Sequence, residues 1–252
     1  MGPLGSRSLP AGGCPGQSAA GECRIPKHGF ARDFDHRVIE VSPDGDAVTY
    51  ELTDTPATRA LYPYAFNLRM TYAITGPATL TQTFRVENTG TEPMPFSVGG
   101  HPAFNVPMPG AGTEAFEDYE LRFIEPWTAT SPKIVEGGLM SYDDPFAIIN
   151  DTDTLPLTRS CFDFDTIVLR DVPESTVTLR GRTSGHGVRV DFPGFDFIGI
   201  WSAQPDAPFV ALEPWTGHAA RNTDDDILEH RDNVTILVPG AVDERSFSVT
   251  VF

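Results

Sequence analysis

Two segments of this sequence carry residues that can exchange protons near neutral pH. The first, Gly99–Asn105, reads Gly-Gly-His-Pro-Ala-Phe-Asn and holds His101 between two glycines and a proline. The second, Leu212–Gly217, reads Leu-Glu-Pro-Trp-Thr-Gly and holds Glu213 directly after an apolar run. A histidine can donate a proton and a carboxylate can accept one, so His101 and Glu213 form a candidate general acid–base pair. Only folding can bring them together, because they lie far apart in the sequence.

Both residues also have a plain structural interpretation. His101 can simply end a strand, and Glu213 can reach solvent from the end of one. A carboxylate that follows a buried strand costs free energy unless it is paired, hydrated or functional. The local sequence leaves both interpretations open.

Two further segments carry polar groups suited to hydroxyl binding. The run Pro-Lys-His-Gly-Phe-Ala-Arg places His28 and Arg32 around a flexible glycine, and both side chains can donate hydrogen bonds to hydroxyls. The run Phe-Asp-Phe-Asp contains Asp163 and Asp165, which share one face if the segment is a regular strand. One carboxylate there can accept hydrogen bonds from two neighbouring sugar hydroxyls. Taken singly, an ordinary charged loop and a strand-entry turn explain these segments equally well.

Three aromatic residues, Phe104, Trp201 and Trp215, can stack on the apolar face of a sugar ring. Because an all-β core also uses such residues, they support sugar binding only weakly.

Composition restricts the classes of partner. The chain has 252 residues, 40% of them hydrophobic, and a formal net charge of -17. Such a charge repels nucleic acid and anionic membrane surfaces. The sequence has no apolar run of about 18 residues, and it lacks a P-loop and a glycine-rich dinucleotide fingerprint. We therefore expect a globular protein that binds a small molecule, with no nucleic-acid or membrane partner.

Alternation of apolar and polar residues with period two predicts an all-β fold. Residues 68–74, 79–86 and 247–251 follow this pattern, which is typical of half-buried strands. Further strand candidates are residues 38–41, 47–52, 118–123, 166–169, 175–180, 187–192, 197–201, 209–213 and 234–238. A short helical turn is expected near residues 223–229. The whole predicts one large antiparallel β-sandwich domain over residues 25–252.

The N-terminal segment and the cysteines give weaker indications. Residues 1–24 are rich in Gly, Pro and Ala, lack a signal peptide and are expected to be disordered or loop-like, with a start that resembles a tag remnant. The three cysteines, Cys14, Cys23 and Cys161, show no metal-ligand spacing. A bridge between Cys14 and Cys23 is one alternative. A reducing, cytoplasmic setting is the expectation.

Taken together and in this order, the four motifs resemble the galactose mutarotase-like family, the aldose 1-epimerases, and in particular its bacterial branch. The resemblance runs from about Pro26 to Phe252. It implies a large antiparallel β-supersandwich, an isomerase of carbohydrate metabolism, and no cofactor or metal. Family members usually carry further strands ahead of the His-Gly-Phe-Ala-Arg motif. Because few strand signals precede it here, we expect the fold to lack the first N-terminal strands.

The resemblance also assigns roles to residues. Glu213 is expected to take the proton of the C1 hydroxyl while His101 gives one to the ring oxygen, which opens the ring to the aldehyde. Rotation about C1–C2 and reclosure then yield the other anomer. His28 matches a position that orients the substrate, and Arg32 and Asp165 match positions that bind its oxygens. Asn105 and Trp215 complete the list of expected substrate-binding residues.

Two alternatives remain at this stage. One is a hexose-6-phosphate 1-epimerase, which needs basic residues beside the anomeric site, and the other is a non-catalytic sugar-binding module on the same fold. The sequence does not identify the sugar, and it leaves open whether the protein is a monomer or a homodimer.

Overall fold

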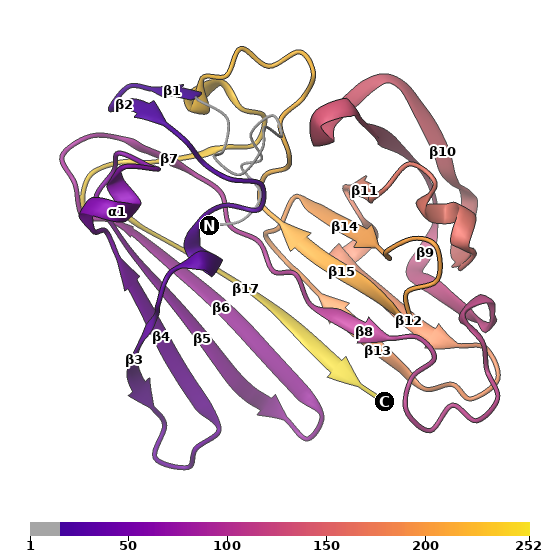
Figure 1. The fold of residues 1–252 in the computed structure, drawn as a ribbon. Coiled ribbons are helices and arrows are strands. Elements are labelled where there is room, and N and C mark those ends of the chain that lie inside the picture. Colours follow the sequence, from indigo (N-terminus) through magenta and orange to yellow (C-terminus); the bar gives the residue numbers. More distant parts are fainter. Residues whose placement is uncertain (1–15) are drawn as a thin grey trace.

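The structure is a computed structural model that describes residues 16–252, and β-strands dominate it (Figure 1). Nine of these strands form one large antiparallel sheet. In the order in which they lie side by side, they are β10 (Leu139–Pro156), β9 (Tyr119–Val135), β12 (Thr176–Gly181), β13 (Gly187–Asp191), β17 (Val242–Val251), β6 (Thr79–Asn88), β5 (Phe66–Gly76), β4 (Ala47–Thr53) and β3 (Arg37–Val41).

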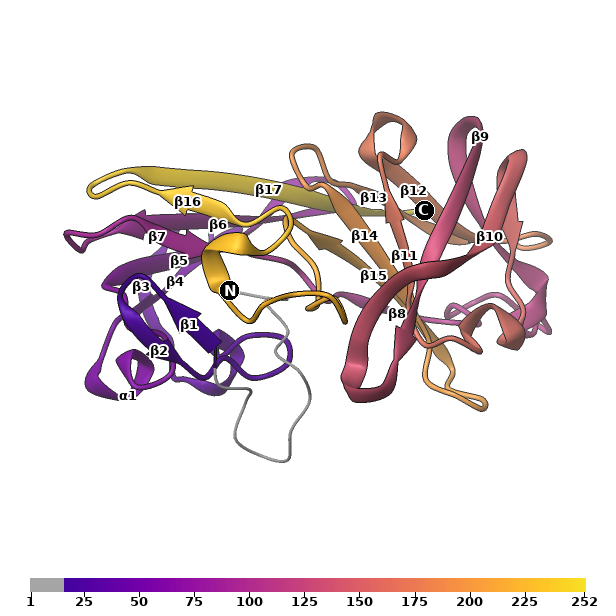
Figure 2. The ribbon, with the colours of Figure 1, turned by 90° about the horizontal axis from the view of Figure 1, so that it is seen from above.

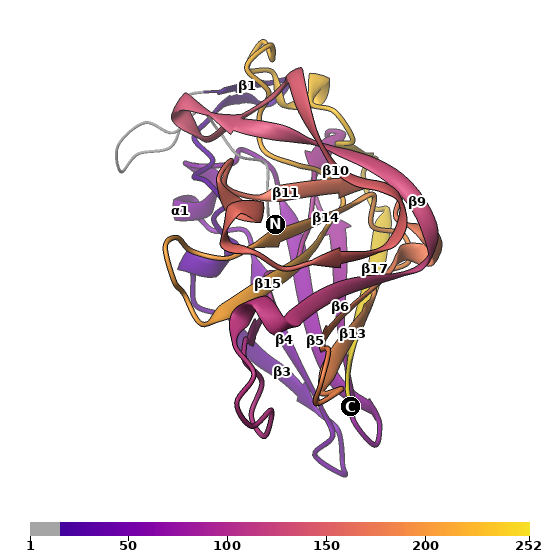
Figure 3. The ribbon, with the colours of Figure 1, turned by 90° about the vertical axis from the view of Figure 1, so that its right-hand side faces the viewer.

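A second sheet of four antiparallel strands packs against the first. Its strands, again in spatial order, are β11 (Ile167–Arg170), β14 (Phe197–Trp201), β15 (Phe209–Trp215) and β8 (Ala103–Asn105). Figures 1 and 2 show this sheet in front of the β12–β13 half of the large sheet, whereas β3–β6 extend past it. Figure 3 shows the long strands β9 and β10 bending past the β11 edge of the smaller sheet.

The predicted alternation correctly identifies which residues of the large sheet point inward and which point outward. Leu68, Phe84 and Val86 point inward and are buried, as an apolar period of two requires. The outer face carries hydroxyl groups, and Thr83 Oγ1 lies 2.8 Å from Ser246 Oγ on the neighbouring strand β17. The all-β sandwich predicted from the sequence is therefore confirmed.

The remaining elements are short. Two further antiparallel pairs join β1 (Gly16–Ser18) to β2 (Gly21–Cys23) and β7 (Met94–Phe96) to β16 (Thr235–Leu237). The α-helix α1 spans only Pro56–Arg59. The six 3-10 turns of the described residues are Ala31–Asp33, Phe116–Asp118, Glu136–Gly138, Arg159–Phe162, Pro173–Ser175 and Leu228–His230. In residues 16–252, no helix is long and apolar enough to cross a membrane.

The N-terminal prediction needs one correction. Residues 16–23, expected to be loop-like, form the hairpin β1–β2, and Cys23 at its end is buried with a free thiol. The hairpin forms because Gln17 also bonds to the backbone carbonyl of Asp226, so tertiary contacts outweigh the weak local strand signal. Cys14 and the possible tag remnant lie outside the described residues.

Asn88 fastens the end of β6 to its surroundings. The side chain is buried, and its Nδ2 donates hydrogen bonds to the backbone oxygens of Glu92 (2.8 Å) and Leu237 (2.7 Å). Its Oδ1 accepts one from the backbone N–H of Gly90 at 2.9 Å. The amide therefore connects the turn after β6 to β16 with each of its polar atoms in use.

We expect Asn88→Asp to lower the free energy of unfolding by at least about 3 kcal/mol, because a carboxylate of the same shape would face two carbonyl oxygens without a proton to donate. Urea unfolding at pH 7 measures the change. Asn150→Asp, at an exposed position of β10, is the matched control. Equal losses in the two variants would contradict this role of Asn88.

Candidate active site

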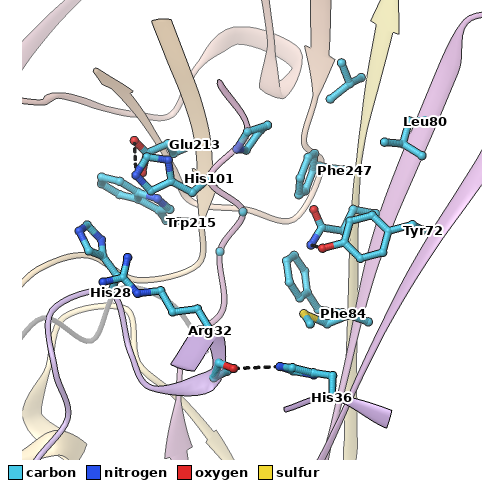
Figure 4. A pocket seen from close by; sticks show the side chains of 17 residues that line it. His28, Arg32, His36, Tyr72, Leu80, Phe84, His101, Glu213, Trp215 and Phe247 are labelled. Carbon is cyan, nitrogen blue, oxygen red and sulfur yellow. Dashed lines mark hydrogen bonds and ion pairs between the residues drawn. The ribbon is translucent and has the colours of Figure 1, made fainter. Parts of the chain in front are cut away.

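Strand register brings His101 to Glu213. Ala103 pairs with Ala211, and Gly99 forms an antiparallel bridge with Trp215. The same register places His101 directly opposite Glu213 at the edge of β15. Their side chains meet there, with His101 Nε2 3.3 Å from Glu213 Oε1 (Figure 4). The juxtaposition expected from the sequence is thus present.

Two glycines make room for this arrangement. A β-carbon on Gly100 would stand 2.5 Å from Cε1 of Phe247 in β17, so only glycine lets the segment before His101 lie on the large sheet. A β-carbon on Gly199 would stand 2.4 Å from the indole of Trp215. Gly199 pairs with Glu213 on the other side of β15. The indole therefore lies across Gly199, beside the carboxyl group.

Burial dominates the electrostatics of Glu213. Its side chain is 4% exposed, whereas that of His101 is 44% exposed. The pKa of Glu213 is raised from its ordinary 4.5 to about 8, mainly by burial and to a smaller extent by the nearby charge of Asp165. A hydrogen bond from Trp215 and the charge of Lys27 act in the opposite direction. The carboxyl group consequently titrates near neutral pH.

The histidine is shifted in the opposite direction. Burial lowers the pKa of His101 below 6.5, and the positive charge of Arg32 adds to the decrease. Around pH 7 these shifts leave the pair with a single proton, which is held mainly by Glu213. A pair that holds one proton can accept a proton on one atom while it donates a proton from another.

A tight turn presents His28 to the pair. The backbone N–H of Gly29 donates to the carbonyl oxygen of Pro26 at 2.9 Å, and His28 has a φ of 68°. A left-handed backbone at a non-glycine residue is unfavourable and often marks a functional position. Phe30 anchors the turn, because it is buried with its ring 5.7 Å from that of Tyr62.

His28 lies close to the pair and is neutral. Its ring centroid is 5.7 Å from that of His101. Burial lowers the pKa of His28 to about 4, and the positive charges of Lys27 and Arg32 contribute, while Asp165 opposes them. A neutral imidazole offers one donor and one acceptor to a ligand without adding a charge beside His101.

Two pockets meet at the pair. A pocket of about 140 Å³ is lined by Asp165 together with Lys27 and Thr166, and a cleft of about 770 Å³ is lined by Arg32. Residues common to both pockets are His28, His101, Glu213 and Trp215. The larger volume falls in the range of about 300–1,000 Å³ that is common for small-molecule sites. Six of the seven residues expected in the site therefore border these pockets.

Asn105 does not lie where the prediction of a substrate-binding residue requires it. Asn105 ends β8 and lines a separate pocket beside His186 and Phe252, so it does not face the His101–Glu213 pair. Asn105 pairs with Phe209, whereas His101 lies opposite Glu213, so Asn105 stands four positions further along β15, on the order of 13 Å away. Membership of one motif therefore did not place both residues in one site.

Of the two interpretations of the segment around Asp163 and Asp165, the strand-entry turn is the correct one. A 3-10 turn ends at Phe162, and β11 begins only at Ile167. Asp165 lies in the turn between them with a φ of 73°, and its Oδ1 accepts a hydrogen bond from Thr166 Oγ1 at 3.0 Å. The turn directs Asp165 to the smaller pocket, which Asp163 does not line.

Sequence reasoning missed several residues that line the pockets. Lys27 and Thr166 adjoin expected site residues, and this proximity is the signal that would have found them. Tyr72, Gln82 and His36 line the larger cleft but belong to ordinary strand patterns or loops. In residues 16–252 there is no group of three or more His, Cys, Asp or Glu side chains arranged to hold a metal ion.

The comparison with known proteins agrees with this geometry. The sequence pattern of the aldose 1-epimerase family matches residues 10–228. The chain belongs to the aldose 1-epimerase family. The chromosomal protein LacX of Lactococcus lactis subsp. lactis is 36% identical over 229 residues, which cover 90% of this chain and 75% of LacX.

Solved structures of the family have the same fold. The galactose mutarotase related enzyme of Lactobacillus acidophilus superposes with a TM-score of 0.85 at 28% identity, covering 94% of this chain and 78% of that one. A galactose mutarotase-like protein of Lactobacillus casei gives a TM-score of 0.78 at 25% identity, covering 98% and 83%. The galactose mutarotase-like β-sandwich expected from the motifs is confirmed.

In this aldose 1-epimerase family member, we expect Gly100→Ala to lower the free energy of unfolding by about 1–3 kcal/mol, because the added methyl group would overlap the buried ring of Phe247. Urea unfolding measures the change. Combining Gly100→Ala with Phe247→Leu removes the overlapping ring atoms and is expected to cost less than the sum of the two single changes. A single Gly100→Ala variant as stable as the parent would contradict the close packing.

Proposed function

We propose that this protein is an aldose 1-epimerase that interconverts the α and β anomers of a free aldohexose by general acid–base catalysis. The observation that carries the proposal is the 3.3 Å contact between His101 Nε2 and Glu213 Oε1 at the junction of two pockets. Family membership supports it, because the family is described by this activity.

The geometry of the pair suits a hemiacetal. The C1 hydroxyl and the ring oxygen of an aldose are bonded to the same carbon, so two proton-exchanging atoms only a few ångströms apart can reach both oxygens at once. Glu213 takes the proton of the hydroxyl while His101 gives its proton to the ring oxygen. The C1–O5 bond breaks and the aldehyde forms. Rotation about C1–C2 and the reverse proton transfers close the ring with the opposite configuration.

The count of protons is conserved through this cycle. The ring-opening step starts from the form of the pair that carries its proton on His101, and it ends with one proton on Glu213. Burial raises the pKa of Glu213 to about 8 and lowers that of His101, so near pH 7 the free protein mainly carries the proton on Glu213 beside a neutral His101. The reactive form, with the proton on His101, is the minor tautomer of the same singly protonated pair.

The neighbouring groups fit the task of orienting the sugar. Neutral His28 can both accept from and donate to hydroxyls, Asp165 accepts hydrogen bonds, and Arg32 donates them. Arg32 is mostly exposed, and within the described part of the chain its one ion pair is a long 3.8 Å contact to Asp33, so its guanidinium is available to a ligand. The indole of Trp215 offers an apolar surface beside Glu213.

Polarimetry on freshly dissolved α-D-glucose and α-D-galactose tests the proposal, with galactose included because the Lactobacillus acidophilus relative is described as galactose mutarotase related. Faster mutarotation with the protein than without it supports the activity. Acceleration confined to a hexose 6-phosphate would instead favour the phosphosugar epimerase. Sugar binding without acceleration would favour a binding module.

We expect Glu213→Gln to lower kcat for mutarotation by about 10²–10⁴-fold, because the amide keeps the shape of the side chain but cannot accept the proton. Polarimetry measures the rate, and isothermal titration calorimetry measures the affinity for the sugar, which should change little. Glu244→Gln, on an exposed residue of β17, is the control. A Glu213→Gln variant with the same kcat as the parent would contradict the assignment of Glu213 as the base.

The rate should also depend on pH with a bell-shaped profile for kcat/KM. On the alkaline side the rate falls near pH 8, where the pair loses its proton. On the acid side it falls below about pH 6.5, because the pair gains a second proton only below the ordinary pKa of histidine.

Asp165→Asn provides the control for this profile. The charge of Asp165 raises the pKa of Glu213, so its removal is expected to shift the alkaline limb to lower pH. A profile that stays flat between pH 5 and 9, in either protein, would contradict a proton shared by the pair.

A further inference from the structure

The larger of the two pockets reaches well beyond the His101–Glu213 pair. Its volume of about 770 Å³ compares with about 140 Å³ for the pocket on the Asp165 side. Figure 4 shows His101 and Glu213 at one end of this cleft and Tyr72 and Leu80 at the other. A monosaccharide held at the pair would therefore leave the far end of the cleft unoccupied.

The floor of the cleft is the inner face of β5, β6 and β17. Phe84 and Phe247 form its buried part, and Tyr72 and Leu80 continue the same apolar face outward. Leu80 is 39% exposed although it points to the side of the sheet that is buried elsewhere. The inner face thus presents aromatic and aliphatic surface to the cleft, of the kind that stacks against the apolar face of a pyranose ring.

Polar groups with unused hydrogen-bonding capacity border this floor. Gln82 Nε2 donates to Tyr72 Oη at 3.1 Å, which leaves the phenolic proton of Tyr72 and the amide oxygen of Gln82 available to a ligand. His36 Nε2 lies 2.9 Å from the carbonyl oxygen of Ala31 and must carry the proton to bond to it. His36 Nδ1 is then an acceptor that no group of residues 16–252 satisfies, but the atom is buried, so His36 contributes to the wall of the cleft rather than forming a bond to a ligand.

We propose that this cleft is a second sugar subsite, in which a second pyranose ring stacks on the Tyr72 side of the floor and bonds to Gln82 and to the phenolic hydroxyl of Tyr72. The proposal rests on the proposed epimerase activity, since only the ring that carries the free hemiacetal can react at His101 and Glu213. The preferred substrate is then a reducing disaccharide whose reducing ring lies at the pair. The cleft and the reactive site share His28, His101, Glu213 and Trp215, so one linked ligand can span both.

The experiment compares one-ring and two-ring sugars on the same protein. Isothermal titration calorimetry gives Kd for glucose, galactose, maltose, cellobiose, lactose and melibiose, and polarimetry gives kcat/KM for each. We expect at least one disaccharide to bind about tenfold more tightly than the monosaccharide that forms its reducing end, as one or two added hydrogen bonds and a stacked ring predict. Equal or weaker binding of all four disaccharides would overturn the proposal.

Substitutions in the cleft locate the second ring. Tyr72→Val and Gln82→Val remove the stacking ring and the amide while keeping residues that favour strands. Each is expected to reduce the ratio of disaccharide to monosaccharide affinity by about threefold or more. Thr71→Val, on the opposite face of β5, is the matched control and should leave this ratio unchanged. A disaccharide preference that persists in both cleft variants would place the second ring elsewhere and overturn the assignment.

The two readouts separate failure of the subsite from failure of the proposed function. Tighter disaccharide binding without faster mutarotation of any sugar would support the subsite and contradict the epimerase. Faster mutarotation of monosaccharides, with no gain in affinity for any disaccharide, would support the epimerase and contradict the subsite. Thermal melting of each variant confirms that it is folded before its affinity is compared.

Discussion

Burial of the Glu213 carboxyl group is the constraint on which the rest of the site depends. A pKa of about 8 in place of 4.5 means that ionising this group costs on the order of 5 kcal/mol more than in water. Because the folded state holds this proton more tightly than the unfolded chain, the contribution of Glu213 to stability is present below about pH 4.5 and declines as the pH rises toward 8. The hydrogen bond from Trp215 and the charge of Lys27 offset part of this cost.

Rigid strands position some residues of the site, and turns with a strained backbone position the others. Register along β15 sets the distance within the pair, and glycines at positions 100 and 199 allow the approach. His28 and Asp165, which face the pair from its other sides, both lie in turns with positive φ. Glu213 is fixed by β15, which is hydrogen-bonded on both sides, and His101 by the segment that leads into the edge strand β8. The turns supply side chains from directions that a strand cannot reach.

The strand pattern was predictable where alternation is regular, and it failed where bulges interrupt the ladder. Residues 79–86 and 247–251 alternate cleanly and form β6 and β17. β10 was missed because its Ser-Tyr-Asp-Asp-Pro run has no period of two, and its pairing with β9 shifts register in the same stretch. The residue types of His101 and Glu213 suggested an acid–base pair, but they could not show that the two side chains meet. Register between distant strands follows from tertiary packing rather than from either segment alone.

The larger cleft shows why hydrophobic pattern alone cannot separate core from binding surface. In β6, Leu80 and Val86 occupy the same face and have similar side chains, yet Val86 is fully buried and Leu80 is 39% exposed. The difference arises because the four-stranded sheet covers only part of the large sheet, so the same apolar stripe runs from the core into the open cleft (Figures 1 and 4). Apolar residues that continue a strand pattern beyond the packed layer expose surface at a cost unless a ligand covers them. His101 and Glu213 lie at the boundary between the covered and the uncovered part of the large sheet. The proton-exchanging groups are therefore next to the exposed apolar surface of the cleft.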